Sequence, residues 1–299
     1  MLVAVLYTGQ VRTMNNTIDY IQNVVSNKDS HLFGVIQADD GNFEHYSSLL
    51  RDKIHDNVKS LVEYDKGAYI PLREELLTNM DVGDFWKNYL RNSGSMIEYN
   101  QLYLAFNEMK KYEELNNIRY DYVIRLRTDV VITRSIDFSW LAFTEEQIES
   151  KANRLKEIYS DYSVSHLMNN LLCQERRSFV NRSDLSHEVS DIIDYIKNGR
   201  YIISLRKNVF YIVKRELVDD FIEIGIKYGS IKDYAYANWF DAESQLELFL
   251  KRGNITYFDS VTEVEGDSLY KYYVCNYFDQ QGNLLIRDDV LFFIMRCNL

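Results

Sequence analysis

The chain has 299 residues, of which 46% are hydrophobic and 26% are charged, and its formal net charge at pH 7 is −11. This composition is typical of a globular protein with a sizeable core. The acidic balance argues against a nucleic-acid-binding protein, because contacts to phosphates along a nucleic acid need a basic surface.

The spacing of the cysteines and the lengths of the apolar runs indicate the cellular compartment of the protein. Cys173, Cys275 and Cys297 are far apart and lack the spacing of zinc ligands. The first ten residues lack the basic start of a signal peptide, and no apolar run reaches the 18 residues of a membrane-spanning helix. We therefore expect a cytoplasmic protein without a transmembrane segment.

The chain opens with a strand, a glycine turn and a helix. Residues 2–7 (LVAVLY) form a continuous apolar run, which is typical of a strand covered on both faces. Apolar residues recur at helical spacing over residues 15–26. The turn at Gly9 would let a ligand approach the backbone, and Arg12 would meet a phosphate at the start of the helix. The segment thus supplies four candidate nucleotide-binding residues: Thr8, Gly9, Gln10 and Arg12.

The second strand, over residues 31–38, ends in two acidic residues, Asp39 and Asp40, followed by Gly41. Acids at the carboxyl end of a strand can bind a ribose hydroxyl or a base edge. Asp-Gly is equally a common turn pair, so both interpretations stay open. A third short strand is expected over residues 58–63, and short surface helices over 72–79 and 85–92.

The clearest helix covers residues 95–116 and leads into the next strand in β–α–β order. Its apolar stripe consists of Leu102, Ala105, Phe106, Met109 and Tyr112. Asn100 and Gln101 lie near its start, where they are candidates for polar contacts in a cleft. Solvation is favoured for Asn100, and Gln101 is kept as a candidate donor-binding residue.

Residues 120–134 (YDYVIRLRTDVVITR) predict one strand around which the chain is organised. One face is mostly apolar, and the other carries Arg125, Arg127 and Asp129. Charges are rare within a buried sheet unless they are paired or bind a ligand. Because ligands bind beyond the carboxyl ends of such strands, Asp129 would hold a metal–diphosphate with the arginines behind it. The alternative is an internal ion-pair ladder without a ligand.

The second half predicts a helical insertion, at about residues 144–200, within a single domain spanning 1–299. Beyond it the pattern predicts a strand over 208–214, a helix over 216–228, a strand over 255–258 and an aromatic tail at about 266–299 with a hairpin turn near 279–283. No internal repeat and no long Gly, Ser or Pro linker interrupts the chain.

Residues 238–253 predict a late helix in which Glu243 lies on the apolar face with Trp239, Leu246 and Leu250. A carboxylate among apolar neighbours has a raised pKa unless it is paired, which suits proton transfer. Alternatively, the helix begins later and Glu243 caps its first turn. Asp241 lies on a different face of the same helix.

Two segments together resemble the GT-A glycosyltransferases, in particular bacterial and viral glycan-synthesis members with an RxRxD variant. They are GQxRT after the first strand and YDYVIRLRTDV after the long helix. The resemblance implies an α/β fold: a GT-A-like, Rossmann-type mixed sheet flanked by helices. In that family an acid at a strand end holds a divalent metal, Mn²⁺ or Mg²⁺, against the diphosphate of the donor. The matching residue is Asp129, but Arg127 stands where the family's DxD motif has its first acid, so an arginine could replace the charge of the cation.

Inverting members of the family also carry a late acidic pair, which DAESQLELFLKRG (241–253) resembles. The resemblance implies that Glu243 or Asp241 is the catalytic base, and the apolar face favours Glu243. The expected reaction moves a sugar from a nucleotide diphosphate sugar to a glycan or other hydroxyl acceptor. Two alternatives remain: a sugar nucleotidyltransferase, and a non-catalytic α/β binding module in which the charged residues are structural.

Overall fold

The computed structural model describes residues 1–132 apart from 26, 27 and 40. Beyond them it describes residues 135, 136, 146, 147, 150, 201–206, 209–219, 246, 250, 255–259 and 292–294. The expected insertion at 144–200, the hairpin turn at 279–283 and the single-domain boundary therefore lie largely or wholly outside the described residues and stay predictions.

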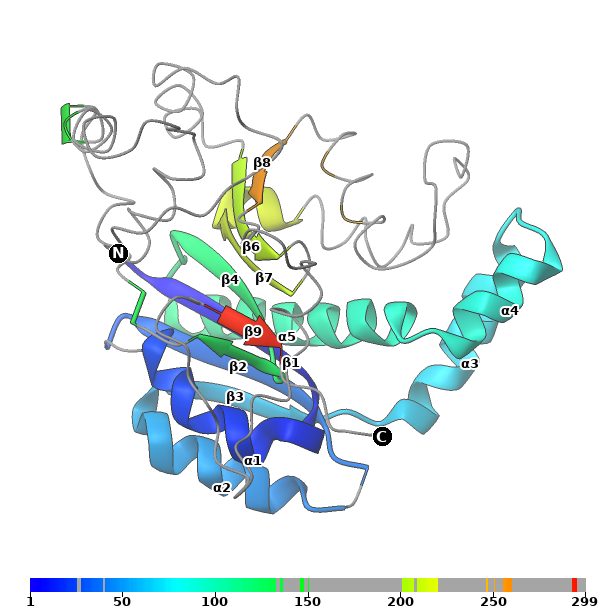
Figure 1. Ribbon diagram of the computed structural model, residues 1–299, viewed down its shortest axis with the longest axis horizontal. Helices are drawn as coiled ribbons and strands as arrows, with labels where there is room; N and C mark the ends of the chain where they lie inside the picture. The colour runs from blue at the N-terminus through cyan, green and yellow to red at the C-terminus, as the bar shows by residue number, and fades with distance from the viewer. Residues whose placement is uncertain are drawn as a thin grey trace, which may run out of the picture.

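The described strands form a seven-stranded mixed sheet in the order β3-β2-β1-β4-β7-β6-β8 (Figure 1). Their bounds are β1 (Val3–Gln10), β2 (Ser30–Gln37), β3 (Val58–Glu63), β4 (Tyr122–Arg127), β6 (Tyr201–Arg206), β7 (Phe210–Lys214) and β8 (Thr256–Asp259). Strands β3, β2, β1 and β4 are parallel, whereas β7 runs antiparallel to both β4 and β6. This confirms the predicted mixed α/β sheet flanked by helices.

The segment 120–134 is not one strand, so that prediction is wrong. Strand β4 ends at Arg127, Thr128 and Asp129 form a turn, and β5 (Val130–Ile132) pairs antiparallel with β9 (Phe292–Ile294) in a separate sheet. The Thr128 hydroxyl donates to the Gln10 carbonyl at 2.7 Å, and its carbonyl accepts from Thr17. These contacts hold the turn that leads the chain out of the sheet.

The first connection also differs from prediction. Gly9 lies within β1, which continues to Gln10, and the expected helix over 15–26 is a series of short pieces. These are a 3₁₀ turn (Val11–Thr13), α1 (Met14–Thr17) and a 3₁₀ segment (Ile18–Asn23). The apolar positions Ile18, Ile21 and Val25 are buried as expected, so the pattern identified the buried face but not the tighter winding.

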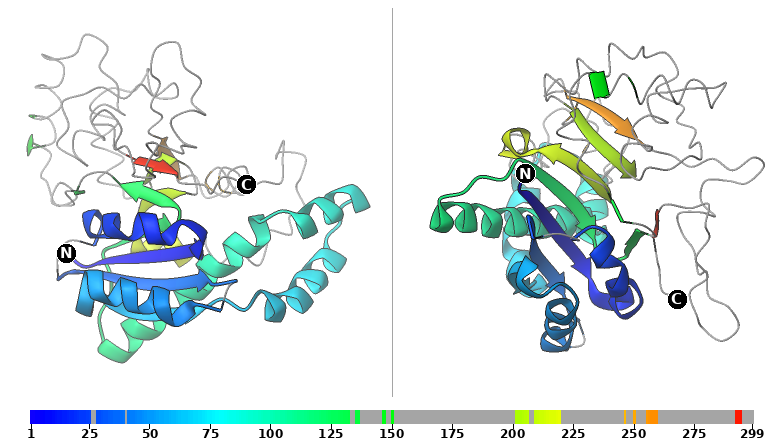
Figure 2. Two further views of the ribbon diagram at one scale, coloured as in Figure 1. Left: turned by 60° about the horizontal axis from the view of Figure 1, so that its bottom comes forward. Right: turned by 90° about the vertical axis from the view of Figure 1, so that its left-hand side faces the viewer.

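Helix α5 (Ser95–Asn116) has the predicted bounds and packs across β1 and β2. It lies on the opposite face of the sheet from α1 (Figures 1 and 2). Asn117 ends α5 in the left-handed conformation, with a φ of 50°. The apolar stripe of α5 packs into the main hydrophobic core. Asn100 is only 7% exposed, so the expectation that Asn100 is solvated is wrong.

Between β2 and α5 the chain forms three further helices. Helix α2 (Phe43–Ile54), which the sequence analysis missed, contacts the 3₁₀ segment after α1 and the strand β3. Helices α3 (Lys66–Asn79) and α4 (Asp84–Asn92) project from the sheet as an arm (Figures 1 and 2). Helix α3 begins six residues before the expected start, because Asp65 caps it by accepting from the Ala68 amide at 3.0 Å.

In the later part of the chain, β7 and β8 confirm the strands expected at 208–214 and 255–258, whereas β6 was not predicted. Residues 215–219 are helical, as expected directly after β7. Leu246 and Leu250 are helical and join the main core, while Asp241 and Glu243 lie outside the described residues. None of the helices in the described ranges could span a lipid bilayer.

Candidate functional site

A cavity of about 290 Å³ opens at the carboxyl ends of β1, β2 and β4. Strand order reverses between β1 and β4, since β2 and β3 continue on one side and β7 on the other. Ligands bind at such a switch point in open α/β sheets. The described residues that line it are Thr8, Gly9, Gln10, Arg12, Gln37, Gly94, Ile97, Glu98, Gln101, Arg125, Arg127, Thr128 and Asp129. We call this cavity the strand-end pocket.

Arg125 forms the floor of the pocket. It is 1% exposed, and its guanidinium donates to the Thr8 hydroxyl and, at 3.1 Å, to Glu98. Burial lowers the pKa of Arg125 from its ordinary value, and the Glu98 carboxylate opposes this effect. Because an arginine keeps its proton in proteins, these contacts hold a fixed positive charge beneath the cavity.

Arg127 and Asp129, which both line the strand-end pocket, form a bidentate ion pair. Nε and Nη2 of Arg127 donate to the two carboxylate oxygens at 2.9 and 2.6 Å. Arg127 also lies 3.5 Å from Glu98, so one carboxylate faces both β4 arginines. The ion-pair alternative from the sequence is thus present in the structure, and a ligand at Arg127 would compete with two carboxylates.

The described residues do not by themselves fit a divalent cation. Both oxygens of Asp129 accept from a guanidinium, which repels a cation. No group of three or more His, Cys, Asp or Glu within the described ranges could hold a metal ion. The metal site expected at Asp129 therefore stays a prediction.

Position 9 has room only for a glycine, because Thr128 lies directly against it. Its φ is +144°, and a Cβ added there would collide with the Thr128 hydroxyl. The Thr128 amide also donates to the Thr8 carbonyl at 3.1 Å. A glycine is thus required where the end of β1 meets the turn that carries Asp129.

Two buried glutamines give the pocket polar capacity that the protein does not use. Gln37 and Gln101 are each 3% exposed, and both line the cavity. The Gln37 Oε1 and the Gln101 Nε2 have no hydrogen-bond partner among the described residues. Buried polar atoms are rarely left unpaired, so an acceptor and a donor remain for a polar ligand or for water.

The acids after β2 do not line the pocket in the part of the chain that the structure describes. Asp39 is exposed and accepts from the Gln37 amide at 2.5 Å, and Asp40 lies outside the described residues. The Gly41 amide donates to the Ala38 carbonyl at 3.2 Å, and Gly41 has a φ of +71°. This geometry supports the turn interpretation of Asp39 and leaves its ligand role a prediction.

The structure brings together eight of the predicted site residues and adds five that sequence reasoning missed. The eight are Thr8, Gly9, Gln10, Arg12, Gln101, Arg125, Arg127 and Asp129. The five are Gln37, Gly94, Ile97, Glu98 and Thr128. Positions 94, 97, 98 and 101 recur at helical spacing, so the face of α5 that carries Gln101 was a usable signal.

No protein-family model matches this chain, and no curated protein is similar to it in sequence. Its structure is similar to glycosyltransferase GlyE of Streptococcus pneumoniae TIGR4, with 8% identity, a TM-score of 0.36 and coverage of 87% of this chain. It is also similar to the bifunctional glycosyltransferase WbbM, with 12% identity, a TM-score of 0.38 and coverage of 86% of this chain. A third similar structure is mouse xyloside xylosyltransferase 1, with 6% identity, a TM-score of 0.36 and coverage of 86% of this chain.

The chain spans less than half of the first two proteins, 45% of GlyE and 38% of WbbM, and 84% of the mouse enzyme. At TM-scores below 0.5 these likenesses carry no argument about what this chain binds or does. The case for a function therefore depends on the geometry of the strand-end pocket.

Proposed function

We propose that this protein is a GT-A-type glycosyltransferase that takes its sugar from a nucleotide diphosphate sugar. One observation carries the proposal: the described residues place Arg12, Arg125 and Arg127 in one pocket at the switch point of a parallel sheet. In a chain with a net charge of −11, such a concentration of guanidinium groups favours a local anionic ligand over a generally basic surface.

The charge balance of the pocket suits a diphosphate. Its described lining carries three arginines against two carboxylates, Glu98 and Asp129, so positive charge is in excess. A guanidinium group can donate two parallel N–H bonds to the oxygens of one phosphate. Arg125 is already oriented by Thr8 and Glu98, so it would stabilise the departing nucleoside diphosphate without reorganisation.

The glutamines would read the uncharged part of the donor. The unpaired Gln37 Oε1 would accept from a hydroxyl or an N–H group, and the unpaired Gln101 Nε2 would donate to an oxygen. A ribose, a base edge or the transferred sugar offers both kinds of group. Asp39 and Asp40 remain candidates for the same part of the donor, with Asp39 acting through Gln37.

The remaining parts of the proposal concern the metal and the base. A divalent metal at Asp129 would require that this carboxylate separate from Arg127; otherwise the arginines supply the positive charge. Deprotonation of a glycan or other hydroxyl acceptor is assigned to Glu243, with Asp241 as the alternative, on the sequence pattern. A positioned base of this kind contributes roughly 10²–10⁴-fold to the rate.

A thermal-shift panel tests the donor site. The full chain is titrated with nucleoside diphosphates and their sugars, with and without Mn²⁺. One nucleotide should stabilise the wild type, since a ligand at 100 times its Kd adds about 2.7 kcal/mol. Arg127→Met should remove most of this shift. The control, Lys53→Met, also removes one cation from an ion pair, but Lys53 pairs with Asp19 outside the described pocket lining, and the shift should persist.

The remaining variants separate the metal from the arginines. Arg127→Met combined with Asp129→Asn removes both charges and guards against misfolding from an unpaired buried aspartate. A shift that needs Mn²⁺ and is lost in Asp129→Asn would support a metal; a shift without metal would assign its role to the arginines. No nucleotide shift in the wild type would overturn the proposal in favour of the binding-module alternative, and an unchanged shift in Arg127→Met would overturn the assignment of the donor to the strand-end pocket.

Product analysis distinguishes the two enzyme classes. A glycosyltransferase releases a nucleoside diphosphate when an acceptor is present, whereas a sugar nucleotidyltransferase releases pyrophosphate from a nucleoside triphosphate. Release of pyrophosphate by the wild type would replace the proposed activity with the alternative.

A further inference from the structure

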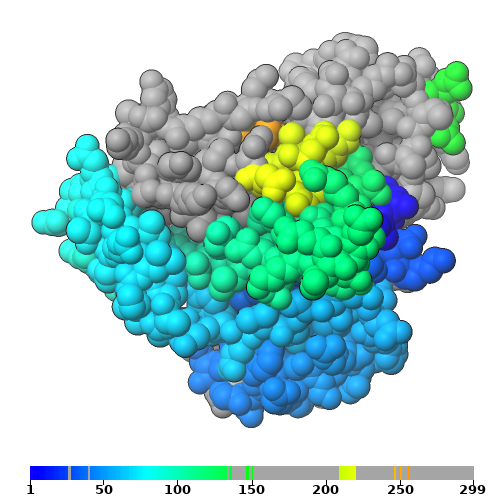
Figure 3. Space-filling model, turned by 180° about the vertical axis from the view of Figure 1, so that it is seen from behind, coloured from blue at the N-terminus to red at the C-terminus, as the bar shows by residue number. Residues whose placement is uncertain are grey.

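A second cavity, of about 390 Å³, lies on the arm formed by α3 and α4. Its described lining consists of Phe85, Asn88, Tyr89, Asn92 and Ser93, and we call it the arm pocket. The arm extends beyond the body of the sheet (Figures 1 and 2), and the space-filling view from behind shows it as a cyan lobe (Figure 3).

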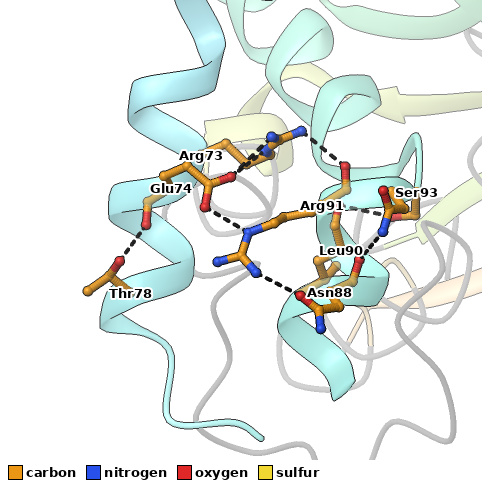
Figure 4. A network of polar contacts seen from close by, with 8 residues as sticks. Arg73, Glu74, Thr78, Asn88, Leu90, Arg91 and Ser93 are labelled. Carbon is orange, nitrogen blue, oxygen red and sulfur yellow. Dashed lines mark hydrogen bonds and ion pairs between the residues drawn. The ribbon is translucent and has the colours of Figure 1, made fainter. Parts of the chain in front are cut away.

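Helices α3 and α4 of the arm are joined to each other by apolar and polar contacts, which hold the arm pocket in place. Leu77, Met80 and Leu90 form a small core that is separate from the main core. Arg91 donates to Glu74 at 2.8 Å, and Arg73 donates to the Arg91 carbonyl at 3.1 Å (Figure 4). These bonds join α4 to α3 and fix the side of α4 that faces the pocket.

The lining combines aromatic rings with neutral amides. Phe85 is 69% exposed, so its ring is accessible to a ligand at the surface. It packs edge-on against Trp86, with ring centroids 5.1 Å apart, and Trp86 packs in the same way against Tyr89 at 6.0 Å. The contact with Trp86 orients the Phe85 ring.

The two asparagines lie one helical turn apart and are oriented by existing bonds. Asn88 Oδ1 accepts from Arg91 at 2.9 Å, and Asn92 Nδ2 donates to the Asn88 carbonyl at 2.8 Å. Each amide therefore keeps its second polar atom for another partner, a donor on Asn88 and an acceptor on Asn92.

This chemistry fits a neutral, hydroxylated ring. The C–H face of a sugar packs on an aromatic ring while its hydroxyls bond to a donor and an acceptor beside it. The described lining contains no charged side chain, in contrast to the arginine-rich strand-end pocket. A phosphate or nucleotide would find no cation in this described lining, and the neighbouring Arg91 is already paired with Glu74. A plain apolar partner would leave the amides unpaired.

The arm pocket also adjoins the strand-end pocket along the chain. Ser93 lines the arm pocket, and the next residue, Gly94, lines the strand-end pocket. We propose that the arm pocket binds a neutral saccharide through Phe85, Asn88 and Asn92, and that this saccharide is the acceptor glycan. The acceptor role rests on the proposed function, whereas saccharide binding itself does not.

Saturation-transfer NMR on the full chain tests the binding. The probes are maltotriose, chitotriose and xylotriose. At least one should bind the wild type, and its affinity should fall about tenfold in Phe85→Leu, which keeps an apolar side chain but removes the ring. Phe85→Tyr restores a ring and should bind as the wild type does. Leu72→Ala changes another exposed apolar residue of the arm, outside the described lining, and should bind normally.

Three results would overturn the proposal: no trisaccharide binds the wild type, Phe85→Leu binds as well as the wild type, or sedimentation shows a self-associated wild type that Phe85→Leu dissociates. The last result would make the surface an interface between copies.

The nucleotide thermal shift of Phe85→Leu separates the two proposals and should equal that of the wild type. If no nucleotide stabilises any variant while saccharide binding still depends on Phe85, the proposed function fails and the saccharide site stands.

Discussion

Two arginine–carboxylate clusters lie at opposite ends of β4, and only one is a candidate ligand site. At the amino end, Arg215 donates to both oxygens of Glu113, at 2.9 and 2.7 Å, and to Asp219 at 2.9 Å. Glu113 also accepts from the Tyr120 amide at 3.0 Å. A cavity of about 590 Å³ adjoins this cluster too, so the presence of a cavity does not tell the two ends apart.

The difference lies in charge balance and strand direction. At the amino end the described lining has three cations and three carboxylates, and the contacts of Arg215 join α5, the start of β4 and the helix after β7. At the carboxyl end the described lining of the strand-end pocket has three arginines and two carboxylates, beside unpaired amide atoms. Similar residue types therefore stabilise the fold at one end of a strand and leave binding capacity at the other, where parallel strands bind ligands.

The largest expected effect is the loss of the amino-end cluster. Arg215→Met should lower the free energy of unfolding by about 3–5 kcal/mol, because Glu113 stays buried without its partner. Urea denaturation measures the change. Adding Glu113→Gln should recover part of it, and the nucleotide shift should persist in any variant that stays folded. A loss below about 1 kcal/mol would mean that the cluster is not structural.

Gly9→Ala should have the next largest effect. It should cost about 1–3 kcal/mol of stability, because the backbone is strained for any other residue and the new methyl group meets the Thr128 hydroxyl. The nucleotide shift should weaken as well, since Thr128 precedes Asp129. Gly83→Ala is the matched control: its added methyl group would meet no atom within 4 Å. Equal stability of the two variants in urea would contradict the close contact at Gly9.

A smaller effect sharpens the contrast between the clusters. Glu98→Gln keeps an acceptor near Arg125 and Arg127 but removes the charge that competes with a ligand. Affinity for the stabilising nucleoside diphosphate, measured by calorimetry, should rise roughly threefold. Glu113→Gln should leave this affinity unchanged. A fall in affinity for Glu98→Gln would show that its charge positions the arginines more than it competes.

The smallest expected effect is a pH dependence of stability that comes from His31, near the amino end of β4. Burial, followed by the charge of Lys59, lowers the pKa of His31 below its ordinary 6.5, and the ring bonds to the Tyr120 hydroxyl at 2.8 Å. The unfolded chain therefore binds the proton more readily, and stability falls as the pH drops below about 6.5. Urea midpoints at pH 7.5 and 5.5 should differ less in His31→Gln than in the wild type. Equal differences would contradict this role of His31.

The sequence predicted features that are local and strongly patterned. The bounds of α5 and β3 were correct, because α5 shows a long 3.6-residue period and β3 a short strand pattern. Arg125, Arg127 and Asp129 were identified because charges in a buried strand need partners or ligands. The two-residue turn that separates Arg127 from β5 was missed, because the residues that hold Thr128 in it, Gln10 and Thr17, are distant in sequence.

Contacts distant in sequence could not be predicted in the same way. Glu98 is 27 residues from Arg125, and Gln37 reaches the pocket only because β2 lies beside β1. The unpredicted β6 pairs with β7 and β8, so its partners are set by strand order. Asp39 was a predicted site residue and Gln37 was not, but the turn at Gly41 leaves Asp39 outside the described lining.

The sequence by itself determined the positions of the strands of the seven-stranded sheet other than β6, the long helix and the charged residues of β4 that such a sheet must accommodate. The tertiary structure decided which of these charges meet: Arg125 with Thr8 and Glu98, and Arg215 with Glu113. The physical reason is that periodicity fixes the face on which a side chain lies, whereas strand order and direction fix which faces and ends adjoin. Only that arrangement places the excess of arginines at one end of β4.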